Sequence, residues 1–426
     1  MNKLGKYLSY KESGVEWLGE IPSEWEILPS KRFHINLKEL NTRRNCSNVL
    51  SLTLRGVVNN NLDSPEGLVP KDYATYQIFE KNDLVFKLID LENISTSRVG
   101  LVHEKGIMSS AYIRIQLEKD SLPKYAYYYY FNLYLNQVYN NLGSGVRSTL
   151  GPTDLLNIEY TKPSYSEQIK IASFLDTKTK QLDIAIKQKE QLIELLKERR
   201  QILINDAVIK GIDDSVAMKD TNFKWLGKIP KHWELKTLKY TLKERIERTD
   251  TGNESLFMMS QIYGLVVRSD YHNKSVVAQS SIGNKKVYKN DLVFNKLKAH
   301  LGVFSKSNID EVGIVSPDYA VYYSLGDIAD LKYLEYLFKS PIYISHFISK
   351  ATGIVEGFIR LYTDDLFSLK VPIPPKREQE KILNYIEKHN EKIDKAITLQ
   401  QQQITKLKEY KITLIDSVVT GKVKVL

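Results

Sequence analysis

The chain repeats itself once, and this internal repeat constrains its fold more than any other feature. Four motifs recur in the same order, at offsets that drift only from 208 to 211 residues. The pairs are WLGEIPSEWE at 17–26 with WLGKIPKHWE at 225–234, KNDLVF at 81–86 and 289–294, EQ at 167–168 and 378–379, and VIKG at 208–211 with VVTG at 418–421. This order predicts two copies of one unit of about 210 residues.

Each copy begins with a part of about 150 residues that mixes strand and helix signals. Short β-type runs such as Asp83–Phe86 and Ala320–Tyr323 alternate with Gly and Asn turns. A tyrosine-rich helical stretch follows, near residues 125–139 and 331–347. Its rings can stack on nucleic-acid bases or pack a core, and the second interpretation is favoured.

A long helical segment without Gly or Pro closes each copy. Large side chains recur there at spacings of three and four, and the two copies match at an offset of 211. Polar residues such as Lys178, Arg199 and His389 interrupt this seam, which favours a partly hydrated or register-fixing contact. The apolar seam positions are Ile171, Leu175, Leu182, Ile186, Ile193, Leu196 and Leu203, and Ile382, Ile386, Ile393, Ile397, Ile404, Leu407 and Leu414.

Helices of about 40 residues are too long to bury their stripes on one small domain, so packing on each other is the economical solution. A pseudo-twofold relation between the copies makes the pair antiparallel. We therefore expect an α+β protein with two mixed domains at 1–162 and 216–371. Two long helices, within 163–215 and 372–426, separate them and form an antiparallel coiled coil. A helical hairpin inside one compact domain is the alternative.

Two similar but diverged domains suit a target with two different parts. The net charge is +10, of which nine charges lie beyond residue 215, so bulk charge alone is weak support for nucleic-acid binding. Residues 40–75 bear no clear likeness to 248–283. Such drift between repeated motifs is typical of variable recognition loops on a constant scaffold.

In order and duplication, these motifs resemble the specificity subunits of type I restriction-modification systems. The likeness extends over nearly the whole chain, and the first copy departs where Lys87-Leu88-Ile89-Asp90 follows Phe86 and where Ser109–Tyr112 replaces Ser316–Tyr319. It rests on the Trp17 and Trp225 openings, DLVFNK at 291–296, GIVSP at 313–317, and PIPP at 372–375 leading into Glu378-Gln379.

The resemblance implies two target-recognition domains, each reading half of an asymmetric, bipartite site in double-stranded DNA. It also implies that the long helices form a spacer and dock two DNA methyltransferase (modification) subunits, with motor-nuclease (restriction) subunits beyond them. S-adenosylmethionine, ATP and Mg²⁺ would then belong to the partner subunits, and this chain would hold no cofactor and carry no catalysis.

Several absences agree with a non-catalytic subunit. The sequence has no Asn-Pro-Pro-aromatic tetrapeptide of adenine methyltransferases and no Gly-x-x-x-x-Gly-Lys-Ser/Thr phosphate loop. Its seven histidines show no metal-ligand spacing. The single cysteine, Cys46, and the polar opening residues favour a cytoplasmic protein that does not enter a membrane. A self-sufficient nuclease or methyltransferase, or a coiled-coil adaptor without a DNA role, are the alternatives.

Base reading requires polar side chains on loops that can enter a groove, and cations nearby for phosphates. A solvated surface role is about as expected for any one of the candidates. They are Arg43, Arg44, Lys87, Asn93, Arg98, Ser144 and Arg147 in the first copy, and Lys285, Lys286, Asn295, Lys296, Lys298, His300 and Arg360 in the second.

Overall fold

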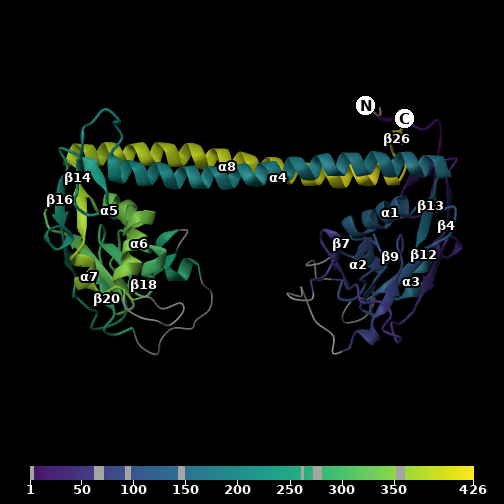
Figure 1. Ribbon diagram of the computed structural model, residues 1–426, viewed down its shortest axis with the longest axis horizontal. Helices are drawn as coiled ribbons and strands as arrows, with labels where there is room; N and C mark the ends of the chain where they lie inside the picture. Colours follow the sequence, from purple (N-terminus) through teal and green to yellow (C-terminus); the bar gives the residue numbers. More distant parts are fainter. Residues whose placement is uncertain are drawn as a thin grey trace. The chain divides into compact units, whose positions relative to one another are not determined.

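The computed structural model describes residues 4–61, 72–91, 97–142, 149–260, 263–271, 281–326, 328–351 and 360–426 (Figure 1). It divides into two compact units, and each is described by itself. Unit 1 comprises residues 1–190 and 401–426, and unit 2 comprises residues 191–400. Within the described ranges, no helix is long and apolar enough to cross a membrane.

Unit 1 is built on a four-stranded antiparallel sheet in the order β10-β9-β12-β5. Its strands are β5 (His34–Leu37), β9 (Leu84–Phe86), β10 (Val99–Leu101) and β12 (Ile113–Leu117). Five two-stranded antiparallel pairs surround it: β2 (Tyr10–Glu12) with β3 (Glu20–Pro22), β4 (Glu26–Pro29) with β13 (Glu159–Lys162), β6 (Leu50–Thr53) with β7 (Gly56–Asn59), β8 (Gln77–Phe79) with β11 (Gly106–Met108), and β1 (Leu4–Gly5) with β26 (Lys424–Val425).

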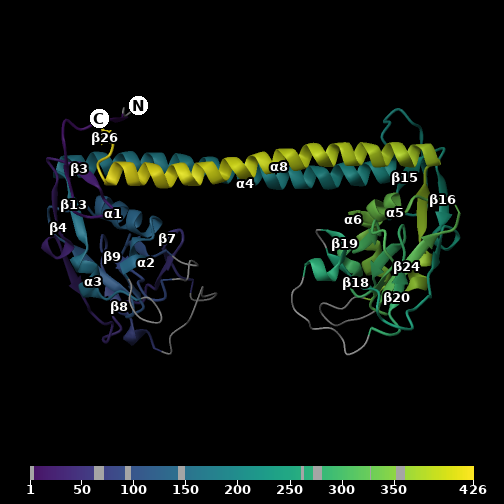
Figure 2. The same ribbon diagram turned by 180° about the vertical axis from the view of Figure 1, so that it is seen from behind.

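The pairing of β1 with β26 joins the two ends of the chain. Leu4 lies opposite Val425 and Gly5 opposite Lys424. Figure 2 shows the N and C labels side by side in unit 1. The core of this unit therefore includes residues from both ends of the sequence, such as Ile21 and Val418.

Unit 2 repeats the sheet of unit 1 in the order β17-β24-β21-β22. Its strands are β17 (Leu242–Glu244), β21 (Leu292–Asn295), β22 (Phe304–Lys306) and β24 (Tyr319–Ser324). A second sheet has the order β19-β18-β23-β20, with β18 (Ser255–Ser260), β19 (Gly264–Val267), β20 (Lys285–Val287) and β23 (Gly313–Val315). Two pairs complete the strands, β14 (Met218–Asp220) with β15 (Lys228–Pro230) and β16 (Glu234–Thr237) with β25 (Lys370–Ile373).

Helices pack against one face of the β10-β9-β12-β5 sheet in unit 1 and of the β17-β24-β21-β22 sheet in unit 2. In unit 1 they are α1 (Pro123–Leu135), α2 (Val138–Leu142), α3 (Pro152–Asn157) and the start of α4 (Tyr165–Lys210), with 3₁₀ turns η1 (Ser30–Arg32) and η2 (Tyr73–Thr75). In unit 2 they are α5 (Leu331–Phe338), α6 (Pro341–Lys350), α7 (Thr363–Phe367) and the start of α8 (Lys376–Val419), with turns η3 (Leu238–Tyr240), η4 (Arg268–Asp270) and η5 (Ala299–Leu301). Each predicted tyrosine-rich helix is thus two shorter helices.

The two long helices pack antiparallel in both units. In unit 1, Lys411 of α8 forms an ion pair with Asp183 of α4 at 2.7 Å, and the amine of Lys189 donates to Gln403. In unit 2, Arg200 pairs with Asp394. Residue numbers fall along one helix as they rise along the other, so the prediction of an α+β fold with two long antiparallel helices is confirmed.

Every one of the fourteen apolar seam positions is buried or half-buried. The seam drifts near the end of α4, however, since Arg199 is exposed while its neighbour Arg200 bonds to α8. Further along α4, the predicted seam residue Leu203 is only half-buried, whereas its neighbour Ile204 is buried. A straight helix has 3.6 residues per turn, so it turns away from a strict 3.5-residue repeat by about 20° per heptad.

The repeated Glu-Gln dipeptide fastens the start of each long helix. Gln168 accepts a hydrogen bond from the Leu122 amide and donates to the carbonyls of Asp120 and Pro163. Gln379 makes the same three contacts in unit 2, with the Asp330 amide and the Ile328 and Pro374 carbonyls. Both glutamines are buried because their amides satisfy backbone groups that the chain cannot pair elsewhere.

The glutamate of the dipeptide holds a buried tryptophan. The indole N–H of Trp25 donates to Glu167 at 3.1 Å, and that of Trp233 donates to Glu378 at 3.0 Å. Both indoles are at most 1 % exposed. The second tryptophan of each repeat opening, Trp17 or Trp225, is half-buried.

Glycines end the long helices against these indoles. Gly211 and Gly421 have positive φ angles of 82° and 76°. A β-carbon on Gly421 would lie 2.3 Å from Pro22 and 3.2 Å from Trp25, and one on Gly211 would lie 3.3 Å from Trp233. The repeated glycine is therefore required both by its left-handed backbone and by the close approach of the repeat opening.

Candidate nucleic-acid interface

The strongest candidate cluster is built around the end of β21 in unit 2. Asn295, the last residue of this strand, is 7 % exposed, and its side-chain oxygen accepts a hydrogen bond from the Leu297 amide at 3.1 Å. This contact shapes the turn that follows. The Lys296 carbonyl then accepts from the Leu361 amide, so the predicted loops at 295–300 and 360 lie together.

Two cations near this loop are already paired. Lys285 of β20 is 5 % exposed and donates to Glu244 of β17 at 2.7 Å. Burial works to raise the pKa of Glu244, but hydrogen bonds, first of all from Lys285, outweigh it and leave the pKa below its ordinary value. Arg360 pairs with Asp318 at 2.6 Å. The two carboxylates were not foreseen from the sequence, because nothing marks them locally.

Lys296 is the unusual member of the cluster. It is half-buried, and burial together with the charges of Lys285 and Arg360 lowers the pKa of its amine. Glu244 and Asp318 act in the opposite direction, and they are already engaged by the other two cations. A cation held close to two others is stabilised by an incoming anion such as a DNA phosphate.

The remaining candidates of unit 2 surround this cluster. Lys298 is exposed, and His300 is half-buried, with no hydrogen bond to its Nδ1 within the described residues. Lys286 of β20 forms an ion pair with Glu247 at 3.1 Å. The structure thus places Lys296, Lys298 and His300 on one short loop, with Arg360 beside it and Lys285 beneath it.

The equivalent loop of unit 1 has a different chemistry. Arg98 is 2 % exposed and donates to the carbonyls of Ile89 and Asp90, so it holds the loop in place rather than presenting a charge at the surface. Lys87 is half-buried, and its amide bonds to the Arg98 carbonyl at 3.0 Å. At an offset of 208, the buried Leu88 takes the position of Lys296.

Arg43 and Arg44 lie on an exposed turn before β6. Arg44 has a positive φ of 50° and pairs with Asp72 at 2.8 Å. They are not brought next to the β9 loop by any contact among the described residues. The candidates Asn93, Ser144 and Arg147 lie outside the described residues.

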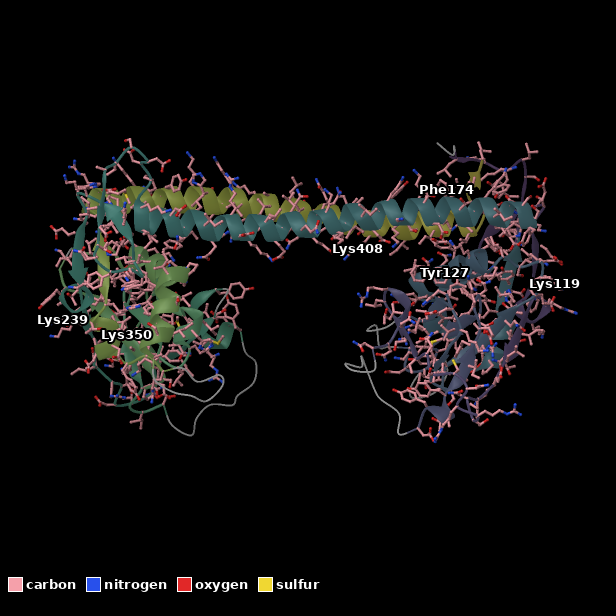
Figure 3. The ribbon with its side chains drawn as sticks, in the orientation of Figure 1. Lys119, Tyr127, Phe174, Lys239, Lys350 and Lys408 are labelled. Atoms are coloured by element: carbon pink, nitrogen blue, oxygen red, sulfur yellow. The ribbon has the colours of Figure 1, made fainter. Side chains whose placement is uncertain are left out.

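Most of the α1 tyrosines serve the core. Tyr125, Tyr129 and Tyr130 are at most 1 % exposed. Tyr127, labelled on α1 in Figure 3, is half-buried and stacks on Phe131 with ring centroids 5.4 Å apart. Burial first, and then the nearby charges of α4, raise the pKa of Tyr127 to about 12, so its hydroxyl stays neutral at physiological pH.

No metal centre is found in the part of the chain that the structure describes. There, no three His, Cys, Asp or Glu side chains gather as a metal site would require. The chemistry available at the candidate interface is therefore that of cations, amides and hydroxyls, which bind polyanions and base edges.

Comparisons with known proteins point to one family. Residues 55–195 match the family model described as the type I restriction modification DNA specificity domain. A putative type I restriction enzyme MjaX specificity subunit from Methanocaldococcus jannaschii is 22 % identical, and the alignment covers 98 % of both chains. Over nearly its whole length, the chain is therefore similar to the specificity subunits of type I restriction-modification systems.

Solved structures show that the chain shares its fold with type I subunits. A structure titled for complex assembly and conformational transition of the type I R-M system superposes with a TM-score of 0.66 and 13 % identity, covering 94 % of this chain and 98 % of that chain. The HsdS subunit of Thermoanaerobacter tengcongensis gives a TM-score of 0.53 and 13 % identity, covering 96 % of this chain and 99 % of that one.

Proposed function

We propose that this chain is a specificity subunit and reads an asymmetric, two-part DNA sequence, one part with each of its two recognition domains. The observation that carries the proposal is the contrast between equivalent loops on one repeated sheet. After β21 the loop presents Lys296 and Lys298, whereas after β9 the same positions hold Leu88 and Asp90. A constant scaffold with different polar groups at one place suits two different half-sites.

A domain exchange tests whether each recognition domain determines one half-site by itself. Residues 220–370 are replaced with the matching segment of a related specificity subunit, and the recognition sequence is determined by methylome sequencing of cells that carry the system. We expect the exchange to change one half-site and to leave the other, and the gap between them, as before. A change in both halves would refute the modular proposal.

We further propose that the helix pair sets the gap between half-sites. One heptad is inserted after Glu190 in α4 and one before Gln401 in α8, so that the pair stays in register. Seven residues add about 10 Å of helix, which corresponds to about three base pairs of DNA. The tolerated gap should lengthen by that amount while both half-sites are retained. An unchanged gap would exclude a spacer role.

The helix pair also offers a surface for the modification subunits that the family resemblance implies. In unit 2 a groove of about 640 Å³ is lined by Leu195, Ile202, Leu203, Ile212 and Tyr385, among others. Leu195 is 59 % exposed and Ile202 55 % exposed. Exposed apolar groups gathered on one face mark interaction sites in many proteins.

The docking proposal is tested by co-purification. Leu195→Glu should reduce retention of the methyltransferase subunit by the specificity subunit at least tenfold, because it places a charge in an apolar contact. Lys395→Glu, on the exposed face of α8 in the same unit, is the control and should retain the partner. Equal retention by both variants would show that the groove is not the docking surface.

We propose that the chain itself is not an enzyme and that S-adenosylmethionine, ATP and Mg²⁺ act on partner subunits. The purified chain should neither methylate nor cut DNA under conditions in which the complete complex does both. Turnover by the chain alone would favour the self-sufficient enzyme instead. A complex without any sequence preference in a mobility-shift competition would favour the adaptor.

A further inference from the structure

Both units carry the same β-hairpin in the segment where their sequences have drifted apart. In unit 1 the hairpin is β6–β7, and in unit 2 it is β18–β19. Each returning strand begins with a glycine of positive φ, Gly56 at 95° and Gly264 at 73°, and these two glycines are 208 residues apart. The connection is one residue longer in unit 2.

The two hairpins pack on equivalent strands of the repeated sheet. A β-carbon on Gly100 of β10 would touch Leu52 and Val57 of the first hairpin. In unit 2 the Leu265 amide of the second hairpin donates to the Ser305 hydroxyl of β22 at 3.1 Å. Gly100 pairs with Val85 just as Ser305 pairs with Val293, so the hairpins occupy the same place.

The turn of this hairpin lies at the end of the sheet that carries the candidate interface. Met259, near the Gly264 end of the hairpin in unit 2, and Tyr319 pack against the same hydrophobic cluster, which includes Leu265 and Val293. Tyr319 is the cross-strand partner of Asn295, after which the cationic loop begins. It also follows Asp318, which binds Arg360. Hairpin turn and cationic loop therefore share one end of unit 2.

The residue before the glycine differs between the units. In unit 1 it is Arg55, which is exposed and lines a groove of about 480 Å³ with His103 and Tyr127. In unit 2 it is Tyr263, which is 62 % exposed. Its ring contacts that of Tyr271, itself 48 % exposed, with centroids 5.2 Å apart. Two tyrosines that touch each other and still remain largely in water form an unusual surface.

We propose that this turn is a base-reading element in both recognition domains, with Arg55 contacting the first half-site and Tyr263, supported by Tyr271, the second. The inference rests on the proposed DNA-reading function and extends it to a segment that sequence motifs do not mark. The occupant is double-stranded DNA, because the neighbouring loop of unit 2 supplies the cations Lys296 and Lys298 that a polyanion requires.

The two side chains would read DNA in different ways. A guanidinium donates two parallel hydrogen bonds to one base edge, preferably guanine. A tyrosine ring packs on an apolar base surface or partly enters a base step, and its partner ring keeps it in position. The exchange of one for the other at an equivalent turn is therefore sufficient to give the two domains different preferences.

The chain supplies a matched control pair. Arg32 and Tyr240 are also 208 residues apart, at the ends of the equivalent turns η1 and η3. Tyr240 is 61 % exposed, almost the same as Tyr263. The turn η3 leads into β17, where Leu242 pairs with Ser324, at the opposite end of the sheet from Asn295. Lys239, the neighbour of Tyr240, lies at the margin of unit 2 away from β18 (Figures 1 and 3).

The test uses the complex of the full chain with its methyltransferase subunits. The probe is a duplex carrying the sequence that the unaltered complex selects from a randomised pool. Arg55→Ala, Tyr263→Ala, Tyr263→Phe and the controls Arg32→Ala and Tyr240→Ala are compared. For each complex, affinity is measured over a series of salt concentrations, and the selection is repeated.

We expect Arg55→Ala to weaken binding about tenfold or more and to relax the selected sequence only in one half-site. Tyr263→Ala should relax only the other half-site, with a loss of about tenfold and an unchanged salt dependence, because no charge is removed. Tyr263→Phe should keep most of the affinity, and both controls should select and bind as the unaltered complex does.

Two failures are distinguishable. If the unaltered complex selects a sequence and the Arg55 and Tyr263 variants select the same one with equal affinity, the inference about the turn is overturned while the DNA-reading function stands. If the unaltered complex selects no sequence at all, the proposed function itself fails. Losses of equal size in the variants and in their controls would also overturn the inference.

Discussion

Arg114 of β12 lies directly across the strand pair from Leu37 of β5, and in unit 2 the arginine and the apolar residue have changed places. The equivalent positions are Val321 and Arg245, which are joined by a backbone hydrogen bond of 2.7 Å. Each arginine reaches the same aspartate of the repeat. Arg114 donates to Asp83 at 2.6 Å, and Arg245 donates to Asp291 at 2.8 and 2.9 Å.

This exchange predicts a compensating pair of substitutions. Arg114→Leu leaves Asp83 buried without its partner and should lower the stability of unit 1 by about 3 kcal/mol or more. Adding Leu37→Arg rebuilds the arrangement of unit 2 and should recover most of that loss. Hydrogen exchange of β9 and β12 amides in the full chain measures the local opening free energy. A double variant no more protected than Arg114→Leu would contradict the equivalence of the two sites.

His34 should make unit 1 sensitive to acid. Its Nδ1 lies 2.8 Å from the Tyr130 hydroxyl, and because that hydroxyl donates to Ser30, the Nδ1–H of His34 donates to it. Burial, and then the charge of Lys162, lower the pKa of His34 to about 3, against about 6.5 for an exposed histidine. At pH values between these two pKa values, His34 therefore binds a proton in the unfolded chain but not in the folded chain.

The contribution of the neutral His34 to the free energy of unfolding is fully present above about pH 6.5. It is lost as the pH falls toward 3, at about 1.4 kcal/mol per pH unit in the steepest part. His34→Phe should make the pH dependence of the urea midpoint shallower in this range. His103→Phe, at an exposed histidine of the same unit, should leave that pH dependence unchanged. Parallel profiles for His34→Phe and the unaltered chain would show that His34 is not the group that titrates.

The helix-ending glycines should differ in their tolerance of a side chain. Gly421→Ala combines a left-handed backbone with a close contact to Pro22, whereas Gly19→Ala in the same unit has φ of 64° and nothing within 4 Å. The backbone strain alone costs about 1 kcal/mol, so Gly19→Ala should lower the melting temperature slightly and Gly421→Ala considerably more. Gly211→Ala, with its nearest atom at 3.3 Å, should fall between them. Equal shifts would mean that the repeat opening is not packed against the helix end.

The buried glutamines should tolerate no charge. Gln379→Glu removes the two N–H donors and directs a carboxylate at the Ile328 and Pro374 carbonyls, with a cost of about 3 kcal/mol or more. Gln168→Glu should behave alike in unit 1. The control Gln181→Glu, at an exposed position of α4, should be nearly neutral. Thermal denaturation of the full chain separates these outcomes, and a stable Gln379→Glu variant would contradict the assigned contacts.

The scaffold could be predicted because its signals are periodic and duplicated. The seam from Ile171 onward indicated a long helix by spacing alone, and the second copy repeated it. The departure at Arg199 could not be seen, since residue spacing does not show how a helix is wound. The break between α5 and α6 at Ser340, in contrast, has a sequence signal, because Pro341 cannot continue α5 and begins α6.

The arrangement of the candidate interface could be predicted less well than the scaffold. Lys285 lies on β20 and Lys296 on the loop after β21, and only the folded unit shows that Glu244 neutralises one of them and leaves the other beside a like charge. The hairpin that carries Arg55 and Tyr263 has one sequence marker, a glycine at an offset of 208, within a segment that otherwise shows no likeness. A single glycine among 21 does not reveal a shared hairpin.

The contribution of the last residues to unit 1 has a consequence for how the chain is made. Unit 2 is one continuous stretch of sequence. The core of unit 1, in contrast, includes Ile415 and Val419, and its strand β1 can pair with β26 only after residues 424–425 have been synthesised. During synthesis on the ribosome, the first domain to emerge can therefore be the last to be completed, the reverse of the usual N-to-C order. Until residues 415–421 have left the ribosome, Trp25 lacks the helix end that packs against it, and part of the unit 1 core stays exposed.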